Sequence, residues 1–224
     1  MAPSPLARAA FGLVALVGLA GLVLSMALTI TDPGSFPPAD PGLFGESDTL
    51  GRVADWLSYF THWSIVLVVV VFGLLALRPG PPSRAFRVLL LDALLMISVT
   101  GIVYAAVLAP VAPPMDAAES LANALQHYLT PPLAVLAFAV FGPRGWLERR
   151  LIPAALIIPV VWLVYTYARG AIIDAYPYGF INVVDLGYPM ALVNTLVILV
   201  FGIAICFALI GIDRLARRWS GTAT

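Results

Sequence analysis

The sequence predicts an all-α protein in which six transmembrane helices form one bundle, and three observations lead to this fold class. Of 224 residues, 61% are hydrophobic and 11% are charged, and the mean hydropathy is +0.98, outside the range of soluble globular proteins. Six segments each reach the roughly 20 apolar residues that a helix needs to cross a bilayer. Proline, glycine and charged residues separate these segments. We expect residues 1–224 to form a single membrane domain.

The predicted spans follow the apolar segments in order. They cover residues 9–30, 56–77, 86–110, 121–142, 151–169 and 188–212. Turn and helix-stop signals occur in the links 32–38, 78–82, 112–114 and 142–145. The first span resembles a signal peptide in the small residues around Met26, but its apolar region exceeds the usual 7 to 15 residues and its basic region is Arg8 alone. We therefore expect it to be retained as a helix.

The distribution of arginine predicts the orientation of the bundle. The chain has no lysine, and 10 of its 12 arginines lie at the two termini and in the second and fourth links. Arg52 and Arg169 alone lie in the other links. Because basic loops stay in the cytoplasm, both termini should be cytoplasmic, in a multi-pass protein of the plasma membrane or the cell inner membrane. The net charge of +0 gives no field that would recruit nucleic acid.

A polar patch opens the second span, where unpaired polar groups are costly and indicate function. Ser58, Thr61 and His62 share one arc if residues 56–77 form one helix. At 1.5 Å per residue, Thr61 and His127 of the fourth span each lie roughly 8 to 9 Å below the outer boundary. Asn123 shares the His127 stripe, which ends at Pro131-Pro132, a pair that favours a kink. We therefore expect a polar chamber in the outer half of the membrane.

The residues in this chamber limit its chemistry. Thr61 is a candidate nucleophile and His127 a candidate base if burial keeps the ring neutral, with Asn123 orienting it. An ester oxyanion would need hydrogen-bond donors, for which the candidates are His62, Asn194 and Tyr165. The structural alternative is that Thr61 bonds a carbonyl of its own helix and both histidines bridge helices. Neither a metal nor a cofactor is required.

The outer mouth of the bundle carries two further features with open interpretations. Arg169 can bind a fatty acid carboxylate or extend towards lipid headgroups. The aromatic stretch Tyr176-Pro177-Tyr178-Gly179-Phe180 can anchor the chain at the membrane interface or form part of a lid over an acyl chain.

Three phrases, in this order, carry a family resemblance. They are Tyr59-Phe60-Thr61 followed by Phe72-Gly73, then His127-Tyr128-Leu129-Thr130-Pro131-Pro132-Leu133, then Tyr176-Pro177-Tyr178-Gly179-Phe180-Ile181. The chain resembles a bacterial member of the androgen-induced membrane protein family, which includes the androgen-dependent regulator of tissue factor pathway inhibitor. This resemblance implies a threonine hydrolase that cleaves fatty acid esters of hydroxy fatty acids, with Thr61 and His127 as its catalytic pair.

Two other classes of function are also compatible with these residues. His62 and His127 can be axial ligands of a haem held between facing spans. A lipid-binding or transport protein would use the chamber as a passage without breaking a bond. The partners expected under the enzyme hypothesis are membrane lipids and a fatty acid ester, and the sequence does not predict the oligomeric state.

Overall fold

The computed structural model describes residues 4–31, 48–77 and 83–221, with side chains described as far as Arg218. The predicted links 32–38 and 78–82 lie outside these ranges, within which the chain forms helices and no strand. The longer helices are α1 (Pro5–Thr31), α3 (Phe60–Leu77), α4 (Arg84–Val103), α6 (Thr130–Phe141), α8 (Ile157–Ile173) and α9 (Val183–Gly221). The shorter ones are α2 (Thr49–Ser58), α5 (Ala117–Asn123), α7 (Ile152–Ala155), the π-helices η1 (Tyr104–Leu108) and η3 (Ala124–Leu129), and the 3-10 turns η2 (Ala109–Val111), η4 (Arg149–Leu151) and η5 (Gly179–Ile181).

Six helical stretches in the described part of the chain are long and apolar enough to cross a membrane, which confirms the predicted fold class. They cover residues 5–31, 60–77, 84–111, 117–141, 149–173 and 183–218. The largest difference from the predicted ends is at the last span, which continues to residue 218 rather than 212. The structure therefore has the six spans that the sequence predicts.

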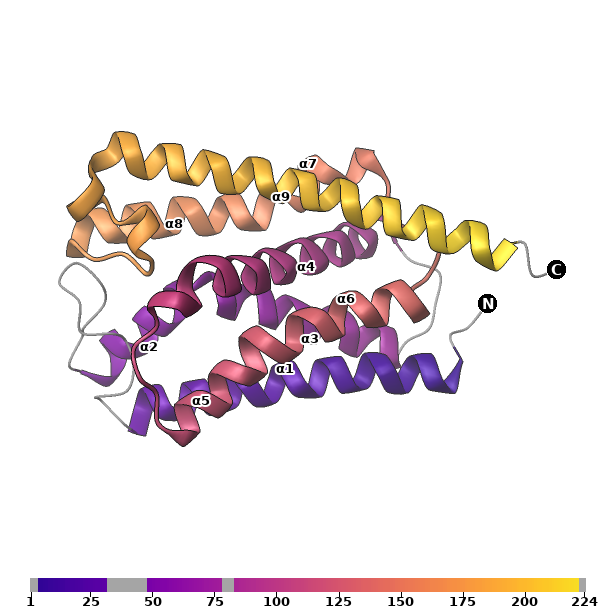
Figure 1. Ribbon diagram of the computed structural model, residues 1–224, viewed down its shortest axis with the longest axis horizontal. Helices are drawn as coiled ribbons and strands as arrows, with labels where there is room; N and C mark the ends of the chain where they lie inside the picture. Colours follow the sequence, from indigo (N-terminus) through magenta and orange to yellow (C-terminus); the bar gives the residue numbers. More distant parts are fainter. Residues whose placement is uncertain (1–3, 32–47, 78–82, 222–224) are drawn as a thin grey trace.

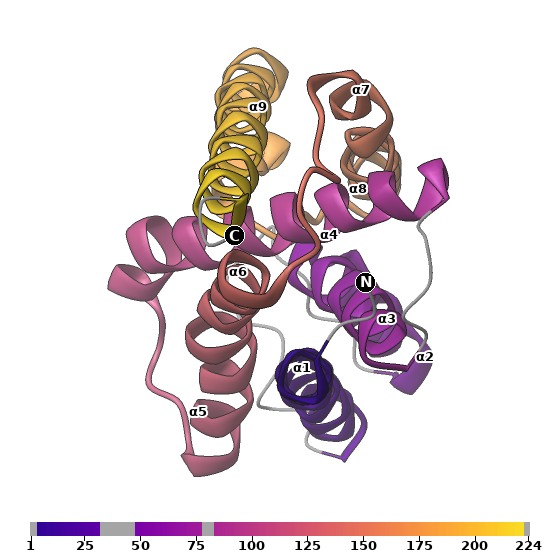
Figure 2. The same cartoon turned by 90° about the vertical axis from the view of Figure 1, so that its right-hand side faces the viewer.

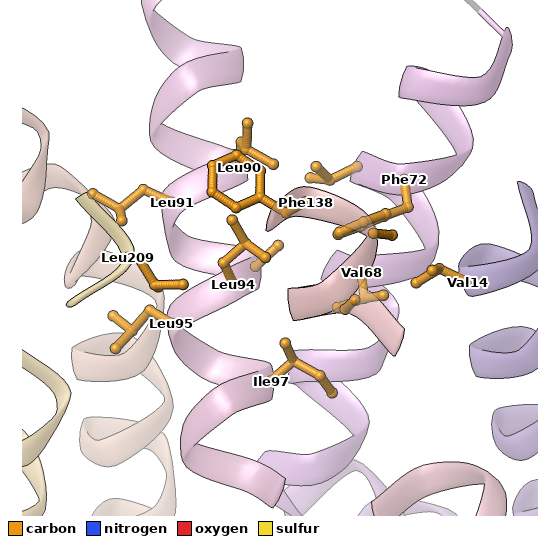
Figure 3. Packing of buried hydrophobic residues seen from close by; sticks show 14 of the residues in the cluster. Val14, Val68, Phe72, Leu90, Leu91, Leu94, Leu95, Ile97, Phe138 and Leu209 are labelled. Carbon is orange, nitrogen blue, oxygen red and sulfur yellow. The ribbon is translucent and has the colours of Figure 1, made fainter. Parts of the chain in front are cut away.

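Helix α4 runs through the middle of the bundle. Helices α1 and α3 pack together on one side of it, α9 packs on the opposite side, and α6 contacts α1, α4 and α9 (Figures 1 and 2). Residues Leu90–Thr100 of α4 are all buried, as expected for a helix surrounded by others. Figure 3 shows Leu90 and Leu94 of α4 facing Phe138 of α6, with Phe72 of α3 beyond. This apolar core fixes the helices that carry the candidate site.

The second predicted span is wrong at its start, because the chain breaks between α2 and α3. Tyr59 has an extended backbone with ψ 128°, so residues 56–77 are not one helix and Ser58 does not share a helical face with Thr61. Side chains pair with the three carbonyls at the end of α2. His62 Nδ1 donates to the Trp56 carbonyl at 2.5 Å, Trp63 Nε1 to that of Leu57 at 2.7 Å, and Trp162 Nε1 to that of Ser58 at 2.9 Å.

The break puts Thr61 in the first turn of α3 instead of several residues inside a helix. Two π-helical turns lie across from it, η1 after α4 and η3 before α6. The η3 turn precedes Pro131 and Pro132, which have no N–H to continue the α-helical pattern. Gly101 of α4 allows the close crossing there, since a Cβ at this position would lie 2.7 Å from the Pro131 Cβ. Single π-helical turns occur frequently at functional sites.

Candidate active site

Thr61 and His127 meet across the bundle, although 66 residues separate them in the sequence. Thr61 Oγ1 lies 3.2 Å from His127 Nε2, which is hydrogen-bonding distance. Within the described residues this hydroxyl pairs with side chains, His127 and Tyr178, and not with the backbone carbonyl expected for a structural threonine. Thr61 is 7% exposed, so the contact is largely shielded from solvent. This is the geometry of a hydroxyl nucleophile beside its base.

The His127 ring is held by aromatic stacking. The Tyr104 ring stacks on it with centroids 4.0 Å apart and planes 19° from parallel. Asn123 Nδ2 donates to the Tyr104 hydroxyl at 2.6 Å, so the Asn123 side chain acts on the histidine through Tyr104 rather than by contacting it. The predicted orienting role of Asn123 is therefore indirect in this geometry. The two π-helical turns supply the stack, because Tyr104 begins η1 and His127 lies in η3.

The second nitrogen of His127 is buried and makes no hydrogen bond. The backbone of Asn123, one turn earlier, lies near the ring. Acceptance of a proton by Nε2 requires the neutral tautomer with the hydrogen on Nδ1. No carboxylate of the described residues bonds this nitrogen, so Thr61 and His127 form a pair rather than a triad of the Ser-His-Asp type.

Tyr178 is the residue of this site that the sequence did not indicate as a donor. The backbone N–H of Thr61 donates to the Tyr178 hydroxyl oxygen at 3.5 Å. The Thr61 side chain and the Phe60 backbone also hydrogen-bond this oxygen. Burial raises the pKa of Tyr178 to about 12, with the Thr61 contacts acting in the opposite direction. The phenol therefore stays protonated at neutral pH and can donate a hydrogen bond beside Thr61.

An apolar cavity begins at Thr61 and Tyr178. The space between its lining atoms is about 750 Å³, which includes space open to the outside. Residues of α3, α4, η1, α8, α9 and the loop before α9 line it. Its polar lining is restricted to a few hydroxyl groups, and none of its lining residues among those described carries a formal charge. Neither His127 nor His62 lines the cavity. Thr61 thus has an apolar space on one side and the histidine on the other.

The other predicted site residues are held by partners elsewhere in the fold. The His62 ring stacks on Trp56, with centroids 3.9 Å apart, and hydrogen-bonds the Trp56 carbonyl. His62, the residue after Thr61, therefore stabilises the break between α2 and α3. Asn194 Nδ2 donates to the Phe180 carbonyl at 2.8 Å. The Tyr165 hydroxyl lies 3.0 Å from Ser58 Oγ. None of these three lines the cavity, and none is a hydrogen-bond partner of the Thr61 side chain in the described structure.

Arg169 pairs with a protein carboxylate at the mouth of the bundle. Its Nη2 donates to Asp55 Oδ1 at 2.6 Å, and the side chains are 16% and 1% exposed. The aromatic stretch 176–180 also turns inward: Tyr176 and Tyr178 are 2% and 8% exposed. Both arrangements connect the loop before α9 and the end of α8 to the region around Thr61.

No protein-family model, curated protein or solved structure matches this chain. The resemblance to the androgen-induced family therefore stays a prediction.

Tyr178 lies in a phrase that the sequence analysis singled out, but nothing in that phrase indicates a hydrogen-bond donor to Thr61. A tyrosine in an interfacial Tyr-Pro-Tyr phrase is typical of a membrane anchor. Only the fold shows that η5 and the preceding residues pack Tyr178 onto Trp162 and Phe180, which directs its hydroxyl to the first turn of α3.

Proposed function

We propose that this protein is a membrane-embedded hydrolase of lipid esters, with Thr61 as nucleophile and His127 as general base. The observation that carries the proposal is the 3.2 Å contact between Thr61 Oγ1 and His127 Nε2, at the wall of an uncharged apolar cavity. Apolar space suits hydrocarbon chains, and a hydroxyl paired with an imidazole suits attack on an ester carbonyl.

The reaction balances with water as the only co-substrate. Thr61 Oγ1 attacks the ester carbonyl carbon while its proton passes to His127 Nε2. The tetrahedral intermediate collapses, the bond from the carbonyl carbon to the alcohol oxygen breaks, and His127 returns the proton to that oxygen. Water then attacks the acyl-Thr61 ester, again giving its proton to His127, and the fatty acid leaves as Thr61 is reprotonated.

The negative oxygen of each intermediate needs donors, and two groups support this role. The Tyr178 hydroxyl and the Thr61 N–H already lie against each other, at 3.5 Å, in the absence of an oxyanion. The Tyr178 hydroxyl can rotate to donate to an oxygen formed at the Thr61 side chain, and the Thr61 N–H lies beside the same position. The first turn of α3 adds the partial positive charge of a helix N-terminus, which favours an anion.

The family resemblance favours a fatty acid ester of a hydroxy fatty acid as the substrate. The arginine distribution supports an orientation with cytoplasmic termini and the site in the outer half of the membrane, because 10 of 12 arginines lie at the termini and in the second and fourth links. A lipid ester would enter sideways from the outer leaflet. The setting would be the plasma membrane or the cell inner membrane.

Hydrolysis of a branched fatty acid ester by detergent-purified protein tests this proposal. We expect Thr61→Ala to lower kcat by about 10⁴-fold or more, because the covalent step is lost. We expect His127→Ala to lower it by 10²- to 10⁴-fold, the usual value of a general base. Thr29→Ala is the matched control, since this buried threonine bonds the Ser25 carbonyl of its own helix at 2.9 Å, and it should retain wild-type turnover.

Unchanged turnover in both site variants would rule out the mechanism. Labelling with an alkyl fluorophosphonate gives a covalent readout. The reagent should attach to Thr61 in the wild type and to no residue of Thr61→Ala. A lipid passage without catalysis would give neither turnover nor labelling. A haem protein using His62 and His127 would instead show a Soret band after supply of haem, and its loss in His127→Ala.

A further inference from the structure

We propose that the apolar cavity holds the acyl chain of the ester, that this chain is of medium length, and that Gly202 and Leu95 form the floor that limits it. The inference rests on the proposed ester hydrolysis at Thr61. It adds which half of the substrate occupies the cavity and what sets its length.

The position of His127 decides which half enters. The leaving alcohol oxygen must come within hydrogen-bonding reach of His127 Nε2 to receive its proton. His127 contacts Thr61 but does not line the cavity, so the alcohol part lies on the histidine side of Thr61. The acyl part is attached to the same carbonyl carbon and extends the other way, into the cavity.

The chemistry of the lining agrees with this assignment. The cavity carries no formal charge in its described lining. A hydroxy fatty acid has a carboxylate, and burial of that charge without a partner would be costly. An unsubstituted acyl chain carries no such group. The cavity therefore accepts the acyl half and excludes the charged half.

The depth of the cavity follows from the helices that line it. On α4 its lining extends from Val103 to Leu95, and on α9 from Thr195 to Gly202. At 1.5 Å per residue these stretches are roughly 10 to 12 Å long. Thr61 lies near the upper end, because Ser64, one turn further along α3, bonds Thr100 of α4 at 2.9 Å. With about 1.25 Å per carbon from ordinary bond lengths and angles, this depth accommodates about 8 to 10 carbons.

Dense packing closes the cavity beyond Gly202 and Leu95. A Cβ at position 202 would lie 3.3 Å from Leu95 Cδ1, so the two helices already touch at this level. One turn further, Leu91 of α4 and Cys206 of α9 are both 0% exposed and do not line the cavity. Figure 3 shows Leu91, Leu95 and Leu209 packed together in this region. A longer chain therefore meets a packed core rather than open space.

Selection by this floor is steric. Lipid tails are as apolar as the cavity walls, so moving a methylene from the bilayer into the cavity gains little free energy. Affinity should rise only weakly with chain length until the chain reaches the floor. Beyond that length, a chain must bend or displace packed side chains, and cores resist such overpacking.

Two ester series test the inference, one with variable acyl length and a fixed alcohol, the other with a fixed acyl group and variable alcohol. For the wild type we expect kcat/KM to fall at least tenfold once the acyl chain exceeds about 10 carbons. Gly202→Leu should move this limit down by about 2 to 3 carbons and leave the alcohol series unchanged. Leu156→Ala, at the α8 side of the floor, should move it up. An unchanged acyl profile in both variants would overturn the inference.

Gly211→Leu is the matched control. It makes the same substitution on the same helix, and a Cβ there meets no atom within 4 Å. Gly211 does not line the cavity, so its variant should keep the wild-type acyl profile. A shift in this variant equal to that of Gly202→Leu would assign the effect to α9 in general and overturn the floor.

Photolabelling separates this inference from the proposed function, because it needs no catalysis. A decanoic acid with a terminal diazirine, bound to Thr61→Ala, should label the residues around Leu95, Leu156 and Gly202. Gly202→Leu in the same background should reduce this labelling at least tenfold. If labelling occurs but the wild type hydrolyses no ester, the cavity assignment stands and the enzyme proposal fails. Labelling confined to exposed positions such as Val197 and Val200 would overturn the acyl site.

Discussion

The two ends of the bundle treat their polar groups in opposite ways. At the end away from Thr61, Asp213 of α9 is 0% exposed and accepts the backbone N–H groups of Gly145 and Leu147 at 2.8 and 2.9 Å. Arg144 donates to three carbonyls at the end of α6, and Arg87 bonds Glu148. The link between α6 and α7 is thereby fixed to its neighbours by charge-assisted bonds.

At the end that carries Thr61, regular structure is interrupted. The chain breaks at Tyr59, two turns become π-helical, a cavity opens, and the Nδ1 atom of His127 is left without a hydrogen bond. Each of these features costs stability. The packed core and the paired charges of the other end offset that cost. Stability and candidate chemistry are therefore separated along the length of the bundle.

The largest effect expected from this comparison is at Tyr178. Tyr178→Phe removes the hydroxyl but keeps the ring, which stacks on Phe180 with centroids 5.2 Å apart. Because the donor acts on charge that develops in the transition state, we expect kcat for ester hydrolysis to fall by about 10²- to 10³-fold with little change in KM. Steady-state kinetics of the purified variant measure both constants.

Tyr165→Phe is the control for this substitution. The Tyr165 hydroxyl pairs with Ser58 at 3.0 Å, so its loss should change kcat far less than the loss of the Tyr178 hydroxyl. An equal loss in both variants would mean that the aromatic cluster as a whole, and not one donor, supports the reaction. Turnover that is unaffected in Tyr178→Phe would contradict the oxyanion role.

The regular end of the molecule was predictable from sequence, because its determinants are local. Runs of about 20 apolar residues define spans wherever they occur, and proline and glycine mark the links. The candidate pair Thr61 and His127 was also predictable, since polar residues inside a membrane span are rare and indicate function. Their contact at 3.2 Å agrees with the prediction that both lie at one level of the bundle, although the helix start assumed for Thr61 was wrong.

The irregular end was less predictable, because its structure depends on contacts between distant segments. The break at Tyr59 is stabilised by indole and imidazole donors, one of them from Trp162, which lies 104 residues away from Ser58 in the sequence. A periodicity argument continues a helix through such a point, since no proline or glycine interrupts it. For the same reason, Tyr165 and Asn194 were candidate donors and Tyr178 was not. The position of a residue along its helix predicts its level in the bundle, but not whether its side chain faces Thr61.

A second prediction concerns stability at the opposite end. Asp213→Asn replaces one acceptor oxygen by an NH₂ group, which cannot accept from the Gly145 or Leu147 N–H. We expect the free energy of unfolding in detergent to fall by about 1.5 to 3 kcal/mol, while kcat per folded molecule stays unchanged. Denaturant titration and kinetics on one preparation give both values. Asp174→Asn is the control, because Asp174 is exposed and has φ 52°, which asparagine tolerates well.

The smallest expected effect is the pH dependence of the bond between Arg87 and Glu148. The hydrogen bond from Arg87 lowers the pKa of the Glu148 carboxyl below its ordinary value of 4.5, with a further contribution from Arg150. A carboxyl whose pKa is lower in the folded state stabilises the protein above its unfolded-state pKa, and this contribution is lost as the pH falls through the folded-state value. The Tm of the wild type should therefore exceed that of Glu148→Gln slightly at neutral pH, and the difference should disappear on acidification. Because Glu148 lies at the solvent, salt should also reduce the difference. A difference that grows as the pH falls would contradict the pairing, and a change in kcat would contradict the separation of this end from the site.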